Sequence, residues 1–267
     1  MRKRLFLALA ALASLTVQVQ AESIPIDETH FPDAAFRQFV LTEMKYHKSN
    51  GTWALVGTDG MLSDYERKRV VTIGIPDGCQ SAEGIQYFAK SETGTWGMKV
   101  WVESDDLKTL DLSGMDVTSV KADGHKLETL NLAGCTKLTE VECQLNQLTT
   151  LNVEGCTKLE ELKCYENQIT ALNLAQMQEL RYLDCHENQL TGLNINSPAL
   201  QKIDCSHNPL QWLFLPNIDY SINGYWTDLD CSDTQLSSLD LRDNRYNSVD
   251  CSNSPILGIE WSSAGNG

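Results

Sequence analysis

Apolar and polar positions repeat along the second half of the chain in a frame of about 21 residues. Residues 135–155 read CTKLTEVECQLNQLTTLNVEG, and residues 156–176 read CTKLEELKCYENQITALNLAQ. The frame continues over 177–197 and 198–217 and can be written L-x-x-L-x-C-x-x-N-x-L-x-x-L-x-L. Its L-x-L and L-x-C pieces alternate with a period of two, which is the spacing of a β-strand. The apolar positions do not hold an a/d seam, so a coiled coil is excluded.

Stacking of these repeats would bury the apolar positions, because one repeat alone cannot cover its own apolar face. The alternation places the leucine and cysteine of each strand inward and the residues between them outward. Six cysteines share the inward position: Cys143, Cys164, Cys185, Cys205, Cys231 and Cys251. We interpret them as small core residues, because no C-x-x-C pair exists and repeat spacing stacks the thiols along the axis instead of around a metal ion.

An asparagine lies three residues after four of these cysteines, at Asn146, Asn167, Asn188 and Asn208. A buried carboxamide needs hydrogen-bond partners, and loop backbone in the same and the neighbouring coil is the simplest source. We therefore predict that the asparagines form a structural ladder. Thr234 and Ser254 take this position in the last two coils.

The frame resembles the leucine-rich repeat, whose hallmark is L-x-x-L-x-L-x-x-N-x-L. It is most similar to the short 21-residue repeats of exported bacterial proteins that are distantly related to internalin-type surface proteins. The resemblance covers residues 107–261 with interruptions. It implies a leucine-rich-repeat solenoid of the α/β class: right-handed, with parallel β-strands on the concave face, short strands or turns on the opposite side, and a small N-terminal α-helical cap.

The predicted cap contains two helical patterns, over residues 31–46 and 59–70. In the family named above, this region commonly carries an EF-hand-like loop, and Asp59, Ser63 and Glu66 match the second half of its motif. Leu55 and Gly57 stand where the first two carboxylates would be, and calcium needs several oxygen ligands. We therefore expect no cofactor, with calcium at the three matching residues as the alternative. Ser63 and Glu66 also have the spacing of a helix capping box.

The chain begins with three basic residues, a short apolar run and small residues before position 22, which is the pattern of a secretory signal peptide. The run is too short to cross a bilayer, and we expect no membrane span. The expected product is secreted, periplasmic or held at the cell surface. The predicted parts are a signal peptide over 1–21, the helical cap with a degenerate EF-hand-like loop over 22–83, a connecting insertion over 84–106, the solenoid over 107–261 and a tail over 262–267.

The formal net charge of −15 argues against nucleic acid and anionic membrane surfaces as partners, because both require a basic footprint. Nine cysteines in an exported protein would normally suggest disulfides. Cys79, Cys135 and Cys156 lie outside the inward column, and the sequence leaves open whether any of them pair.

Motifs of hydrolases, metalloproteases and nucleotide-binding enzymes are absent from the sequence. Asp184 and His186 face outward on one predicted strand, and Ser206 is the register neighbour of His186 on the next. A working triad also needs an oxyanion hole and a sheltered pocket, which an exposed sheet face does not supply. We therefore predict a non-enzymatic protein and keep a serine hydrolase as the remote alternative.

Aromatic residues mark the predicted binding surface, because solenoid faces are extended contact surfaces and tyrosine and tryptophan are frequent interface anchors. An insertion over 216–229 interrupts the repeat and is rich in aromatics. We predict recognition of a protein at the cell surface or in a host environment; a glycan is the alternative, and a merely solvated face is also open. The candidate ligand-binding residues are Tyr165, Tyr182, Asp184, His186, Trp212, Tyr225 and Trp226.

Overall fold

A computed structural model describes residues 23–88, 97–216, 227–242 and 245–261. The predicted signal peptide over 1–21, the tail over 262–267 and the candidate residues Tyr225 and Trp226 lie outside the described residues. In the described part of the chain, none of the helices has the length and hydropathy needed to span a bilayer.

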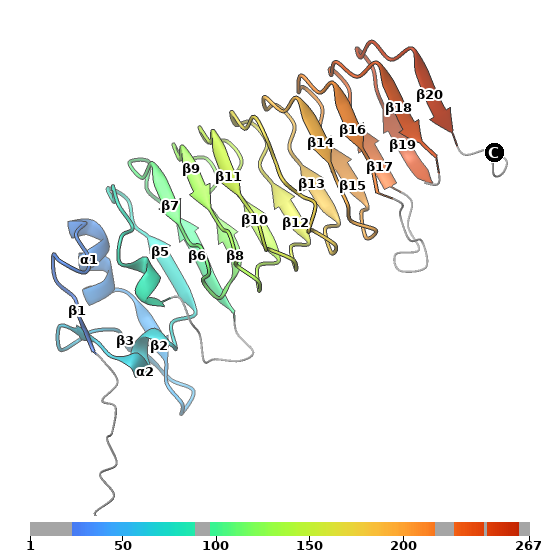
Figure 1. The fold of residues 1–267 in the computed structure, drawn as a ribbon. Helices are drawn as coiled ribbons and strands as arrows, with labels where there is room; N and C mark the ends of the chain where they lie inside the picture. The colour runs from blue at the N-terminus through green and yellow to red at the C-terminus, as the bar shows by residue number, and fades with distance from the viewer. Residues whose placement is uncertain (1–22, 89–96, 217–226, 243–244, 262–267) are drawn as a thin grey trace, which may run out of the picture.

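The described chain is a β-solenoid with two walls of parallel strands (Figure 1). One wall is a nine-stranded sheet in the order β19-β17-β15-β13-β12-β10-β8-β6-β5. Its strands are β5 (Thr72–Ile75), β6 (Met98–Val102), β8 (Val117–Lys121), β10 (Glu140–Glu142), β12 (Glu161–Lys163), β13 (Tyr182–Asp184), β15 (Lys202–Asp204), β17 (Thr227–Asp230) and β19 (Tyr246–Asp250). The parallel-strand leucine-rich-repeat solenoid predicted from the sequence is confirmed.

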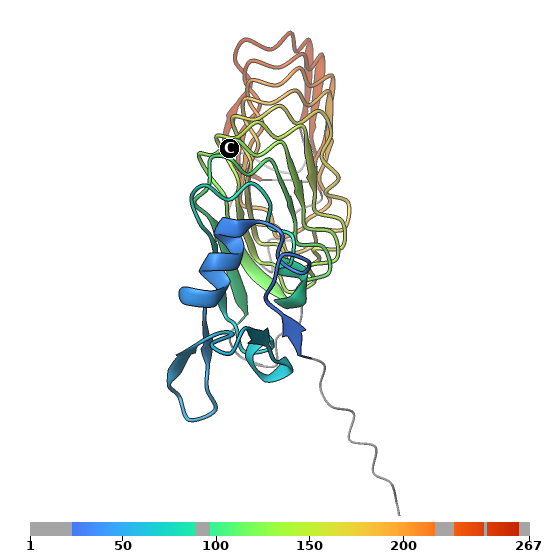
Figure 2. The ribbon, with the colours of Figure 1, turned by 90° about the vertical axis from the view of Figure 1, so that its left-hand side faces the viewer.

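The opposite wall consists of shorter sheets built from the second half of each repeat. Its strands are β7 (Thr109–Asp111), β9 (Thr129–Asn131), β11 (Thr150–Asn152), β14 (Gly192–Asn194), β16 (Trp212–Phe214), β18 (Ser238–Leu241) and β20 (Gly258–Trp261). Seen from the N-terminal end, the coils lie behind one another, and α1 lies in front of the first of them (Figure 2). Each outward position therefore forms a column that runs along the solenoid axis.

The core is a stack of similar layers, because the strands from β8 to β17 pair without a register shift. Leu162 of β12 lies opposite Val141 on one side and Leu183 on the other, which preserves the 21-residue repeat. The predicted inward cysteine column is confirmed, since Cys143, Cys164, Cys185, Cys205 and Cys231 are fully buried and Cys251 is half-buried. All nine cysteines are free thiols.

Cys135 and Cys156, whose pairing the sequence left open, each bond a backbone carbonyl instead. The Cys135 thiol donates to Leu112 O at 3.0 Å, and the Cys156 thiol donates to Leu132 O at 3.1 Å. Burial raises the pKa of Cys135 to about 11 and that of Cys156 to about 12. Both side chains therefore belong to the packed interior between coils.

The predicted asparagine ladder is also confirmed. Asn188 Nδ2 donates to Cys164 O in the preceding coil at 3.0 Å and to Cys185 O in its own coil at 3.1 Å. Its Oδ1 accepts from Ile169 N at 2.9 Å. One buried side chain thus satisfies backbone groups of two consecutive coils.

The N-terminal cap is less helical than the sequence suggested. Helix α1 covers only Ala34–Thr42 of the predicted 31–46, because Asp33 caps it by accepting from Phe36 N at 2.9 Å. The chain after it forms β2 (Lys45–His47), which pairs with β3 (Trp53–Leu55). Of the predicted helix over 59–70, only α2 (Asp64–Arg67) is helical.

The rest of that range is extended, since β4 (Met61–Leu62) pairs with β1 (Ile24–Pro25). A short 3₁₀ helix, η1 (Ile85–Phe88), completes the cap, and Phe31, Phe36 and Phe88 fill its interior. The nine-stranded sheet begins before residue 107: β5 lies in the range expected to be cap, and β6 lies in the range expected to be a connecting insertion.

Candidate recognition surface

An aromatic cluster lies in the middle of the outward face of the nine-stranded sheet. We define it as Tyr165, Tyr182 and His186. The rings of Tyr165 and His186 are stacked, with centroids 4.6 Å apart and an interplanar angle of 12°. Tyr182 is 44% exposed and donates its hydroxyl to Gln201 Oε1 at 2.7 Å. The cluster combines flat apolar surface with polar edges, which suits contact with another molecule.

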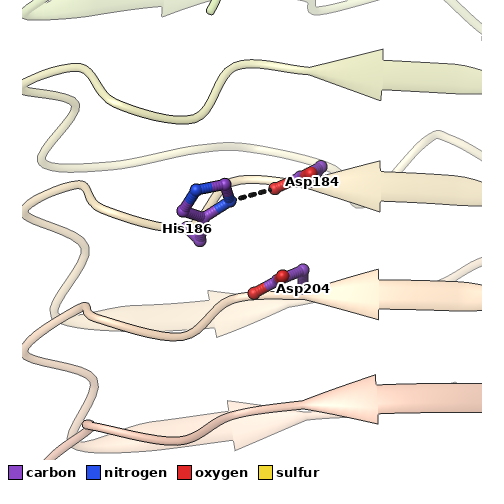
Figure 3. A group of neighbouring side chains, drawn as sticks. All are labelled: Asp184, His186 and Asp204. Carbon is purple, nitrogen blue, oxygen red and sulfur yellow. Dashed lines mark hydrogen bonds and ion pairs between the residues drawn. The ribbon is translucent and has the colours of Figure 1, made fainter.

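Asp184 fixes the orientation of His186. The imidazole Nδ1 donates to Asp184 Oδ1 at 2.6 Å, and both groups are partly buried (Figure 3). The stacked Tyr165 ring and the carboxylate therefore hold the imidazole from two sides. The structure brings three candidates predicted from the sequence into contact, Tyr165, Asp184 and His186, and places Tyr182 on the same strand and face as Asp184.

A column of aspartates continues from this cluster towards the C-terminal end of the sheet. Strand register places Asp184, Asp204, Asp230 and Asp250 side by side on β13, β15, β17 and β19. Neighbouring strands are about 4.8 Å apart, so these carboxylates repel one another. In the part of the chain that the structure describes, no lysine or arginine forms an ion pair with Asp204, Asp230 or Asp250.

Serines stabilise this aspartate column locally. Asp204 accepts from the backbone and the hydroxyl of Ser206, and Asp230 accepts in the same way from Ser232. The backbone of Ser252 donates to Asp250 and lowers the pKa of that carboxyl. The donors in these bonds are neutral, so they do not cancel the negative charge of the column.

The N-terminal half of the same face has the opposite character. There Lys121, Glu142 and Lys163 alternate across β8, β10 and β12. The Lys121–Glu142 contact is 2.6 Å and the Lys163–Glu142 contact is 3.0 Å. The charges on this half are paired, so the excess negative charge of the face lies beyond Tyr182.

A hollow of about 430 Å³ opens in the acidic half, between β15, β17 and β19. Its lining includes Asp204, Asp228, Asp230 and Asp250, with Lys202 as the cation among the described lining residues. Ser248 and Asn247 donate to Asp228 and lower its pKa. The hollow therefore offers several carboxylates to a cationic group of a partner.

Asp184, His186 and Asp204 could hold a metal ion, since their potential ligand atoms lie within 4.8 Å of one another. The site offers three donors from an open sheet face, and the Asp184–His186 hydrogen bond already satisfies one imidazole nitrogen and one carboxylate oxygen. Structural zinc sites have four protein ligands, so an ion here would need at least one ligand beyond these three.

Ser206 does not join His186 in a catalytic arrangement. Its hydroxyl donates to Asp204 Oδ1 at 2.7 Å, and the residue is 5% exposed. The remote serine-hydrolase alternative required Ser206 to donate to His186. Asp184 and His186 are paired as expected, but the nucleophile is held by a different carboxylate.

Trp212 lies away from the other candidates, on β16 in the opposite wall. Trp212 therefore belongs to a different surface from Tyr165 and Tyr182, and its predicted role in ligand binding stays a prediction. The two halves of the repeat form different walls, and Trp212 belongs to the second half. Phe214, which was not among the predicted residues, is 62% exposed beside Trp212; period-two alternation along β16 would have indicated it.

The three residues predicted as alternative calcium ligands form hydrogen bonds at the N-terminus of α2 and in the turn before it. Glu66 accepts from Ser63 N at 2.9 Å and from Ser63 Oγ at 2.7 Å, and Ser63 in turn caps the helix. Asp59 accepts from Met61 N at 3.0 Å. The expected capping box is confirmed, and calcium at Asp59, Ser63 and Glu66 stays an untested prediction.

The fold places this chain among leucine-rich-repeat solenoids, and solved internalins have similar structures. InlP from Listeria monocytogenes aligns with a TM-score of 0.54 at 16% identity, over 85% of this chain and 65% of InlP. Internalin C2 from the same organism aligns at 20% identity over 91% of this chain and 98% of its own, with a TM-score of 0.49.

The functional domain of InlJ from Listeria monocytogenes, described as including a cysteine ladder, aligns at 18% identity over 91% of this chain and 62% of that domain, with a TM-score of 0.36. This chain therefore spans less than two thirds of InlP and of the InlJ domain. No family model matches the chain, and no curated protein matches its sequence. At these identities, the likeness to InlP establishes a shared fold.

Proposed function

We propose that this chain is a non-enzymatic recognition module that binds a protein through the outward face of the nine-stranded sheet. The observation that carries this proposal is the aromatic cluster, in which a stacked Tyr165–His186 pair and an exposed Tyr182 lie on the same face of the sheet. Rigid aromatic side chains gain contact area at little entropic cost, and they are frequent hot spots of protein interfaces.

The aspartate column specifies the chemistry of the partner. Carboxylates at the spacing of neighbouring strands favour a surface that presents lysine or arginine side chains. Such charges accelerate association and select against acidic partners. We therefore propose that the partner is a protein with a basic surface. The tyrosines would supply most of the binding energy, and the aspartates would select for the partner's positive charge.

The proposed setting is outside the cytoplasm. The basic, apolar and small-residue pattern of residues 1–21 supports export, and a partner at the cell surface or in a host environment would then be accessible. Neither nucleic acid nor an anionic membrane suits a face of this charge.

The test compares proteins retained from a surface-protein preparation by the immobilised wild-type chain, Tyr182→Ala and Trp53→Ala. Trp53 is a matched control, because it is 52% exposed but lies in the cap. We expect a protein that wild type and Trp53→Ala retain and Tyr182→Ala loses, with the affinity of the purified partner reduced about tenfold or more. A partner that binds Tyr182→Ala as tightly as wild type would contradict the assigned face.

The double variant Asp204→Asn, Asp230→Asn tests the charge argument separately. It should weaken binding of the same partner at low salt and flatten the dependence of the dissociation constant on ionic strength. An unchanged salt dependence would remove the basic partner from the proposal while leaving the tyrosine anchor in place.

A further inference from the structure

The opposite wall carries a second, unrelated surface around Trp212. Register places Trp212 directly opposite Gly192, and the indole lies across that glycine. A Cβ atom on residue 192 would lie 2.0 Å from Cε2 of the indole, so a larger residue cannot occupy that position without moving the ring. Trp212 is 46% exposed, which leaves ring surface open to solvent.

Trp212 belongs to a column of outward positions on the opposite wall, one from each coil. The side chains in this column become smaller from the N-terminal coils towards Trp212. The column holds Thr129 and Thr150 on β9 and β11, then Ala171 and Gly192. A hollow of about 290 Å³ lies beside the indole, and Ala171 and Gly192 are part of its lining. The hollow is thus a departure from the repeat immediately before the exposed Trp212.

Neutral polar groups surround the hollow. Its lining includes Thr170, Thr191, Asn173 and Asn194, all exposed, together with Trp212. Among the described lining residues none is ionisable, although the chain carries a formal net charge of −15. Asn173 Oδ1 accepts from Ala175 N at 3.3 Å, which orients its carboxamide on the surface. A charged ligand would find no counter-charge here.

We propose that this hollow binds the pyranose ring of a neutral glycan. A pyranose has an apolar C–H face that packs on an aromatic ring, and its edge carries hydroxyls that suit amide and hydroxyl side chains. Phe214, 62% exposed with its ring centroid 5.3 Å from that of Trp212, offers a second ring to the next sugar of a chain. The site lies on the wall opposite the proposed protein-binding face and is independent of it.

Trp101 provides a comparison within the same molecule. It also lies over a glycine, Gly74, but on the nine-stranded sheet and in register with Lys121. Its surroundings are therefore charged, whereas those of Trp212 are neutral. Trp101 is 38% exposed and serves as a matched control for removal of a surface tryptophan.

The test measures binding of the purified chain to an array of neutral and acidic glycans, followed by calorimetry with the strongest neutral oligosaccharide. We expect neutral glycans to bind, acidic ones to bind less, and Trp212→Ala to lose affinity by about tenfold or more. Trp101→Ala should bind as wild type. Asn194→Ala, which removes an exposed amide without touching the core, should also weaken binding if Trp212→Ala proves unfolded.

Several outcomes would overturn the proposal. They are an array without neutral ligands, binding that survives both Trp212→Ala and Asn194→Ala, or preference for acidic glycans. Tyr182→Ala should keep glycan binding, and Trp212→Ala should keep the protein partner. Failure of the glycan site is therefore distinguishable from failure of the proposed protein recognition.

Discussion

At the scale of single residues, stability depends most on the ladder asparagines. Asn167 Nδ2 donates to Cys143 O at 3.1 Å and to Cys164 O at 3.0 Å, and its Oδ1 accepts from Leu148 N at 2.9 Å. Alanine would leave buried backbone groups of two coils without partners, at about 1–3 kcal/mol each. We therefore expect Asn167→Ala to lower the free energy of unfolding by roughly 3–5 kcal/mol, measured by urea denaturation followed by circular dichroism.

Asn173→Ala is the matched control, because that asparagine is exposed on the opposite wall. Its free energy of unfolding should stay within about 0.5 kcal/mol of wild type. A comparably small loss in Asn167→Ala would mean that water replaces the ladder bonds, which would contradict a structural role for the column.

Residue roles set by the repeated frame could be predicted, and contacts between outward side chains of neighbouring coils could not. Alternation put Cys164 inside and Tyr165 outside, and the repeated asparagine position of the frame put Asn167 inside. The stacking of Tyr165 on His186 depends on side-chain rotamers. The separation of Trp212 from Tyr165 was present in the sequence, since the two occupy different halves of the repeat.

At the scale of elements, the paired charges across β8, β10 and β12 make stability depend on pH. The hydrogen bond from Lys121, with a second from Lys163, lowers the pKa of Glu142 in the folded chain. A carboxyl with a lowered folded-state pKa stabilises the fold above its unfolded pKa of about 4.3. That contribution is lost as the pH falls through the folded pKa.

We therefore expect Glu142→Gln to melt below wild type at neutral pH, by the equivalent of about 0.5–1 kcal/mol because the charges are partly solvated. The difference should vanish at low pH, once Glu142 is protonated in both states. Thermal melts of both proteins at neutral pH and in acid provide the measurement. A difference that persists in acid would indicate lost packing instead of lost charge.

Boundaries of elements were the least predictable feature. The pattern over 31–46 predicted a longer helix than α1. The helix ends at Thr42 because Lys45–His47 pairs with Trp53–Leu55, a contact that helical periodicity does not encode. The turn before each ladder position also had no sequence signal. Leu145, Glu166 and Glu187 all adopt left-handed φ of 49–59°, a conformation usually marked by glycine.

At the scale of the whole molecule, each coil contacts only its neighbours, so local opening should start where burial is incomplete. The last described coil is such a place, because Cys251 is half-buried and Val249, Ile256 and Ile259 are only partly buried. Cys231, one coil inward, is fully buried, and burial raises its thiol pKa to about 12. The reactivity of each cysteine in the column therefore shows whether its own coil has opened.

We predict that iodoacetamide labels Cys251 first, Cys231 later, and Cys164 and Cys185 only at the rate of global unfolding. Alkylation requires thiolate, and burial holds the pKa of the inner thiols well above the ordinary value, so each must open before it reacts. Time-resolved labelling read by peptide mass spectrometry gives the order, and labelling in denaturant should reach all nine cysteines. Equal rates at Cys164 and Cys231 would show that the stack opens as one cooperative unit. Fewer than nine labelled cysteines in denaturant would show that some thiols are oxidised, in conflict with a column of free cysteines.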